Sequence, residues 1–231
     1  MGGFQTSVGV QPAPGIEGGF TGFNPHFTLT NPDQGQFVAG TPGPFIGRFA
    51  FADMATGVVT SAHPGTVVVR VGFVHRDQPS LITGLFTQTS LQLVSGQGID
   101  LMEDGPVWTR FAANAVPEQK VYASFADGSC RAAASGQAAT SMGITATTTN
   151  GSPNLTSVAG GALLPGQPIS GAGIPAGAYI VSASGANAVM SANATAAGAN
   201  VAVTATLDTE TSFVVRSFAS AGELAKISVR G

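Results

Sequence analysis

Strand-length apolar runs separated by turn residues occupy most of the chain between residues 45 and 126. The runs are rich in Val, Ile and Phe, whereas Gly, Pro, Asp and Ser gather between them. They cover residues 45–52, 66–74, 81–86, 90–94, 107–112 and 120–126. Short strands at regular spacing are typical of a β-sandwich or barrel. The one helical candidate, residues 219–226, is too short to matter. The sequence therefore predicts an all-β fold with a sandwich- or barrel-like core.

The first 44 residues are dense in Gly, Pro, Asn and Phe, and a helix cannot run through such a segment. We predict an extended N-terminal arm over residues 1–44, whose spaced aromatic side chains dock on another surface. Those side chains are Phe4, Phe20, Phe23 and Phe27. The alternative is an arm that folds onto its own domain.

The composition changes near residue 132. Residues 144–207 contain no Lys, Arg, Asp or Glu, and Tyr179 is their only aromatic residue. Strands are expected there at 144–149, 154–158, 178–182, 188–191 and 200–206, and then at 212–217 and 224–229 after the earlier composition returns. We predict a β core made of residues 45–140 plus 208–231, with residues 141–207 as an inserted, outward-facing β module. Two domains in tandem with a separate tail are the alternative.

Charged residues make up only 9% of the chain, while 43% of the residues are hydrophobic. That hydrophobic content predicts a folded chain rather than a disordered one. A surface poor in charge suits a protein that lives packed against others. The net charge of −3 and the scattered Lys and Arg residues argue against direct binding of nucleic acid.

The N-terminus has neither the positive nor the apolar region of a signal peptide, and no apolar run of about 18 residues could span a bilayer. We therefore expect synthesis in the cytoplasm and no membrane association. The single cysteine, Cys130, excludes an intrachain disulfide and gives no metal-site spacing.

No constellation of residues favours catalysis. A serine hydrolase would place its nucleophile in a G-x-S-x-G turn with a His and an acid nearby, and the chain has no such motif. Cys130 has no CxxC partner, so we expect a small buried or half-buried residue. Asp100, Glu103 and Asp104 match no EF-hand loop, and we expect them in a solvated turn. We predict a protein that is not an enzyme and needs no cofactor or metal; only His75, with acids nearby, motivates the opposite view.

Several short blocks, in their order, resemble the structural cement proteins that decorate tailed-bacteriophage heads. They are residues 3–5, 10–18, 47–53, 72–78, 81–83, 119–123, 127–128, 210–214 and 222–228. The resemblance covers residues 1–135 and 208–231. Residues 147–152 and 171–177 are similar to a β insertion that recurs in assorted phage virion proteins.

This resemblance implies a decoration protein without catalysis that binds the major capsid protein on the outer surface of an assembled head and stabilises the shell. It also implies a homodimer or homotrimer. Aromatic, basic and acidic side chains are concentrated at residues 72–79. They either pair with one another at the edge of a sheet or form a subunit or capsid contact. As capsid or subunit interface residues we predict Phe4, Phe20, Phe23, Arg48, His75, Arg76 and Trp108. The alternative function is a host-attachment or carbohydrate-binding module on the virion surface.

Overall fold

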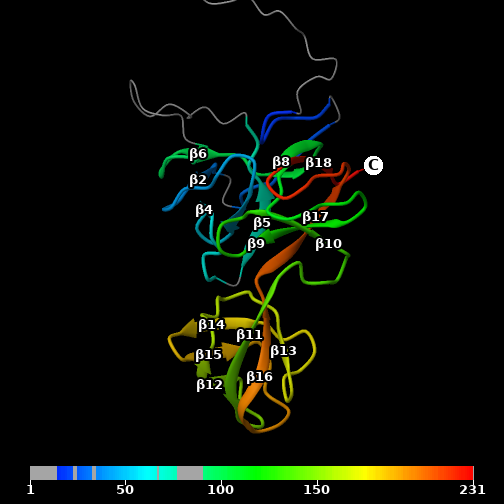
Figure 1. The fold of residues 1–231 in the computed structure, drawn as a ribbon. Helices are drawn as coiled ribbons and strands as arrows, with labels where there is room; N and C mark the ends of the chain where they lie inside the picture. Colours follow the sequence, from blue (N-terminus) through cyan, green and yellow to red (C-terminus); the bar gives the residue numbers. More distant parts are fainter. Residues whose placement is uncertain (1–14, 23–24, 33–34, 67, 77–90, 231) are drawn as a thin grey trace, which may run out of the picture.

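The computed structural model describes residues 15–22, 25–32, 35–66, 68–76 and 91–230. These residues contain eighteen strands and no α-helix, and the strands form three sheets (Figure 1). The all-β prediction with a sandwich- or barrel-like core is confirmed. The described residues include no helix long and apolar enough to cross a membrane.

The first sheet has seven short strands in the order β1-β7-β5-β3-β4-β2-β6. Their bounds are β1 Phe27–Thr28, β2 Phe37–Ala39, β3 Phe49–Asp53, β4 Val58–Thr60, β5 Val69–Phe73, β6 Gly98–Ile99 and β7 Met102–Asp104. All pairs are antiparallel except β2 with β4. The central strand β3 is buried along its whole length, so both faces of this sheet are covered.

The second sheet has five strands in the order β10-β9-β17-β18-β8. Their bounds are β8 Val107–Arg110, β9 Lys120–Ser124, β10 Cys130–Ala133, β17 Asp208–Val215 and β18 Leu224–Ser228. A parallel bridge between Phe111 and Cys130 joins the end of β8 to the edge strand β10, so the sheet curls into a barrel-like shape. Strands β17 and β18, from after residue 207, lie between β9 and β8, which come from before residue 134.

One core lies between these two sheets. Phe49 packs edge-on against Phe73 at 5.4 Å and against Phe213 of β17 at 5.5 Å, measured between ring centroids. Ala50 and Ala52, which alternate with Phe49 and Phe51 along β3, belong to a second cluster on the other face. Because successive side chains of a strand point to opposite faces, β3 contributes residues to two hydrophobic cores.

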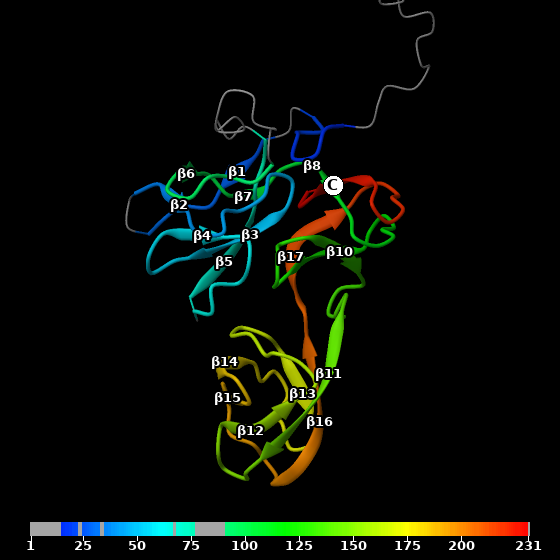
Figure 2. The same cartoon turned by 60° about the vertical axis from the view of Figure 1, so that its left-hand side comes forward.

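The third sheet has six strands in the order β13-β16-β11-β12-β15-β14. Their bounds are β11 Ser141–Thr148, β12 Asn154–Ala159, β13 Ile169–Gly171, β14 Ile180–Ser184, β15 Asn187–Met190 and β16 Gly198–Thr206. It encloses its own core, which includes Ile144, Leu155, Ile180 and Val203. Figures 1 and 2 show this sheet at one end of the molecule, reached through β11 and the passage from β16 to β17. The division of the chain into domains stays a prediction that this arrangement supports.

The predicted extended arm needs correction where the structure describes it. Residues 27–28 and 37–39 are strands of the seven-stranded sheet, and Phe20 pairs with Val107. The physical reason is burial: Leu29, Phe37 and Ala39 are almost inaccessible, and they reach that state only by pairing with the sheet. The alternative of an arm folded onto its own domain therefore describes residues 15–22 and 25–32 better. Residues 1–14 lie outside the described part.

Several other local predictions also change. Glu103 and Asp104 belong to strand β7, which pairs with β1 and β5, rather than to a solvated turn, and they form ion pairs with Arg70 and Arg230. Residues 91–94 contribute only an isolated bridge between Gln92 and Phe45. The range 219–226 contains no helix, as expected, and its last residues belong to β18, which agrees with the predicted strand 224–229. Residues 81–86 lie outside the described residues, and the short strands β4, β6, β7, β10 and β13 were not predicted.

Candidate functional site

The N-terminal segment lies along the free edge of β8, at the end of the molecule opposite the six-stranded sheet (Figure 2). The N–H of Gly18 donates to the carbonyl of Trp108 at 2.8 Å, and the N–H of Trp108 donates to Gly19 at 2.9 Å. The N–H of Thr21 donates to Pro106 at 3.0 Å. Residues 18–21 therefore act as one more strand and cover an edge that would otherwise be open.

Close backbone approach explains two glycines of this segment. Gly15 lies directly against the indole of Trp108, so that a side chain there would overlap the ring. Gly18 has a φ of +78°, and a Cβ atom at this position would lie 2.6 Å from Cγ2 of Ile46. Both positions exclude any residue with a side chain unless the segment moves away.

Arg76 and Glu17 tie the segment to the seven-stranded sheet. The N–H of Arg76 donates to Gly18 at 2.8 Å, and its Nε donates to the carbonyl of Glu17 at 3.0 Å. The Glu17 carboxylate, whose side chain is only 13% exposed, accepts from Nε of Arg110 at 3.0 Å. Glu17 thus joins both sheets, which the sequence did not reveal because its partners are 59 and 93 residues away.

Phe20 covers a small cluster of rings. Its centroid lies 4.8 Å from that of His26 and 5.5 Å from that of His75. His75 is only 6% exposed, and its ring packs beneath that of Phe20. The half-buried Phe20 is the member of this pair that a partner can reach.

Trp108 and its surroundings complete the surface. Its indole is half-buried, and Nζ of Lys226 on the neighbouring strand β18 lies 5.3 Å from the ring centroid. Ile16 is 62% exposed beside this cluster. We call the surface formed by residues 16–20, His75, Arg76, Trp108 and Lys226 the apical face. It presents apolar rings and a few cations in a chain that is otherwise poor in charge.

Arg48 does not share this environment. Its guanidinium pairs with Asp127 at 2.8 Å and lies 4.9 Å from the centroid of the Phe45 ring. The structure therefore brings Phe20, His75, Arg76 and Trp108 together and engages the Arg48 side chain elsewhere. Phe4 and Phe23, the remaining predicted interface residues, lie outside the described residues.

Cys130, the cysteine considered as a nucleophile, has a structural position in the core. Cys130 is fully buried, its Sγ lies 3.0 Å from Oγ1 of Thr109, and burial raises the pKa of its thiol to about 12. A thiol in that state is a poor nucleophile. The described residues contain no group of three or more His, Cys, Asp and Glu side chains placed to hold a metal ion.

Comparison with protein families identifies the chain. The model of the XM1 gp53 minor capsid protein family matches residues 4–159, which is more than half of the chain. The chain belongs to this family. As a member of a family of phage structural proteins, it is a component of the virion and associates with other capsid components. A search of curated proteins finds no match.

The matched residues include the whole N-terminal segment of the apical face and all seven predicted interface residues. They also include the seven-stranded sheet, and they end at the last residue of β12. Strands β17 and β18, which complete the five-stranded sheet, lie outside the match.

Proposed function

We propose that this minor capsid protein is a cement or decoration protein that binds the outer surface of an assembled head through its apical face and stabilises the shell. The family supports a capsid role, and the observation that carries the finer proposal is the composition of the apical face. Half-buried aromatic rings with an Arg nearby are typical of the centre of protein interfaces.

The placement of the six-stranded sheet supports an outward-facing module. It lies at the end opposite the apical face, so attachment through that face directs residues 141–206 away from the shell (Figure 1). Because the module carries no charged side chain, it adds little electrostatic attraction to a neighbouring surface.

The decisive experiment mixes the purified protein with empty expanded heads that lack it and measures cosedimentation, followed by heating of the particles. Saturable binding with a higher temperature of capsid disruption is the expected result. Free capsid subunits should bind little, because one subunit offers only part of the surface that the assembled shell presents.

Two matched variants test whether the apical face makes the contact. Ile16 and Val68 are both 62% exposed, and Val68 lies at the opposite end of β5 from Arg76. We expect Ile16→Asp to lower head occupancy at least about tenfold, while Val68→Asp binds like the wild type. Equal occupancy of both variants would exclude the apical face as the contact.

A shortened chain tests the contribution of the residues before the apical face. Removal of residues 1–14 leaves the hydrogen-bonded segment from residue 15 intact and takes away Phe4. Lower occupancy with unchanged thermal stability of the free protein is expected if these residues grip the shell. Self-association as a dimer or trimer belongs to the same proposal, and light scattering of the free protein measures it.

A further inference from the structure

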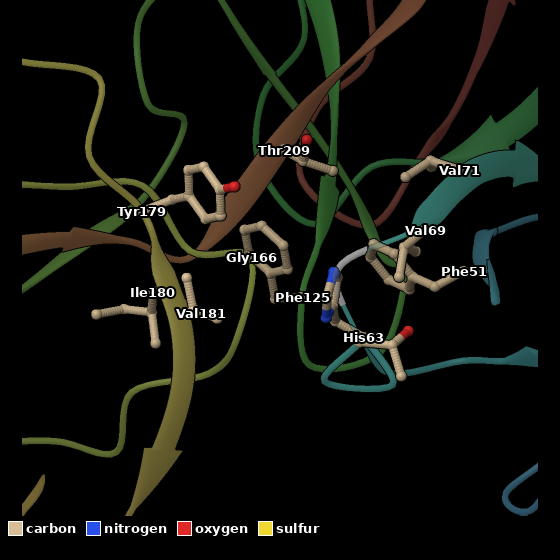
Figure 3. Close-up of a pocket in the computed structure, with 11 residues that line it drawn as sticks. Phe51, His63, Val69, Val71, Phe125, Gly166, Tyr179, Ile180, Val181 and Thr209 are labelled. Atoms are coloured by element: carbon tan, nitrogen blue, oxygen red, sulfur yellow. The ribbon is translucent and has the colours of Figure 1, made fainter. Parts of the chain in front are cut away.

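A cleft separates the six-stranded sheet from the two other sheets, and its walls come from distant parts of the chain (Figure 3). Phe51, His63 and Phe125 lie on the side of the core, while Tyr179 and Val181 lie on the side of the module. The cleft has a volume of about 270 Å³. An apolar cavity of about 150 Å³ holds a benzene ring, so this space is large enough for one six-membered ring with substituents.

Aromatic rings gather around the cleft. Phe51 and Phe125 stack at 6.0 Å between centroids, and His63 stands edge-on to them at 5.3 and 5.2 Å. Tyr179 is the only aromatic residue between positions 144 and 207, and it is 38% exposed. Figure 3 shows the Tyr179 side chain projecting from the module toward the core side of the cleft, where Thr209, Phe125 and His63 lie. The single aromatic residue of the module thus faces the aromatic cluster of the core.

Two polar groups in the cleft are available for a ligand. Nδ1 of His63 accepts a hydrogen bond from the N–H of Gly65 at 3.2 Å, so the proton of the neutral ring resides on Nε2. Within the described part of the chain, neither this Nε2 nor the Tyr179 hydroxyl has a hydrogen-bond partner. Thr66 and Thr209 add hydroxyl groups to the lining.

The cleft is also electrically neutral. None of its lining residues is Asp, Glu, Lys or Arg, and burial holds the pKa of His63 below its ordinary value, which favours the uncharged ring near pH 7. A charged ligand would lose its hydration here without gaining an opposite charge.

We propose that this cleft binds one ring of a neutral saccharide between Tyr179 and the His63 and Phe125 side of the core. The apolar face of a sugar ring packs on aromatic rings, and its hydroxyl groups pair with Nε2 of His63, the Tyr179 hydroxyl and the threonines. This activity lies beyond capsid decoration and does not depend on it. The sequence of residues 141–207 does not reveal the site by itself, because three of the four rings of the site lie outside that range.

Saturation-transfer NMR on the full chain tests the proposal. The probes are glucose, galactose, mannose, N-acetylglucosamine and their short oligomers, with sialic acid as a charged comparison. Tyr179→Ala is the test variant, and Phe218→Ala is its control because Phe218 is 75% exposed in the turn between β17 and β18, outside the cleft. Phe218→Ala should melt like the wild type because Phe218 is mostly exposed, and a melting curve of Tyr179→Ala, where Tyr179 is 38% exposed, checks that this variant folds.

The expected result is a signal from at least one neutral saccharide, whose affinity falls about tenfold or more in Tyr179→Ala and is unchanged in Phe218→Ala. A fall of a few-fold in Tyr179→Phe would report the loss of the hydroxyl alone. Absence of signal from every neutral probe, preference for sialic acid, or equal binding by Tyr179→Ala would overturn the proposal. Head binding by Tyr179→Ala is expected to be normal, which separates this test from that of decoration.

Discussion

The carboxylate of Asp208 accepts two hydrogen bonds from Thr140, one from its backbone N–H at 2.6 Å and one from its hydroxyl at 2.7 Å. Thr140 directly precedes β11, and Asp208 is the first residue of β17. The pair therefore fastens together the chain segments that enter and leave the six-stranded sheet. Asp208 is 1% exposed and also accepts from the N–H of Ala139.

Loss of this carboxylate should loosen the connection. Asp208→Ala leaves the N–H groups of the half-buried residues 139 and 140 without their charged acceptor, and we expect a loss of about 3 kcal/mol in the free energy of unfolding. Urea denaturation measures it. Glu118→Ala is the control, since Glu118 forms an ion pair with Arg216 while its side chain is 77% exposed, and such pairs contribute at most about 1 kcal/mol. Equal losses in the two variants would contradict the role of Asp208.

Glu210 anchors the segment just before Thr140, at residues 135 and 136, in a similar way. Its carboxylate accepts from the N–H of Gly136 at 2.7 Å, from Ser135 at 2.8 Å and from the Tyr122 hydroxyl at 2.9 Å. The bond from Gly136 is the main reason that the pKa of Glu210 lies below its ordinary value. Burial, with the Glu210 bond, raises the pKa of Tyr122 to about 12. Residues 134–140 are thus held to β17 by two successive carboxylates.

His63 should make stability depend on pH. Its pKa is lowered by burial below the ordinary value of 6.5, so the folded state binds a proton less readily than the unfolded state. Its contribution is fully present above pH 6.5 and is lost as the pH falls toward the lowered value. We expect unfolding temperatures measured between pH 7.5 and 5.5 to fall less in His63→Gln than in the wild type. An identical decline in both proteins would show that His63 carries none of this dependence.

Gly15 offers a test of the packing of the N-terminal segment. A methyl group at this position overlaps the indole of Trp108, whereas a Cβ at Gly22 meets no atom within 4 Å. We expect Gly15→Ala to displace the segment, at a cost of about 1–3 kcal/mol. Because Trp108 is the only tryptophan, its fluorescence reports the change directly. Gly22→Ala should keep the wild-type spectrum; a shifted spectrum in Gly22→Ala and not in Gly15→Ala would refute the assignment.

Cys130 should be chemically silent in the folded protein. Its thiol is fully buried, and its pKa is raised to about 12, so almost no thiolate exists at pH 8. We expect no reaction with a thiol reagent at pH 8 over an hour and full reaction in concentrated urea. Rapid labelling under native conditions would show that the strand pair β9–β10 opens readily.

The sequence alone predicts those strands and turns that depend on residues close together in the chain. Short apolar runs between turn residues predict the strands near β3, β5, β8 and β9, and the turn at residues 127–128 marks the hairpin that contains Cys130. The composition change near residue 132 comes a few residues before the point where the chain enters the third sheet at β11. These features depend on neighbours in the chain, so they can be recognised without knowing the fold.

Tertiary structure decided which strands pair and which side chains meet. Strands of two or three residues such as β6 and β7 carry almost no local signal, and they exist because neighbouring strands supply their hydrogen bonds. The placement of Glu17 between Arg76 and Arg110, and of Tyr179 opposite His63, joins residues that are far apart in sequence. Such contacts depend on the free energy of the whole packed chain, which no local pattern encodes.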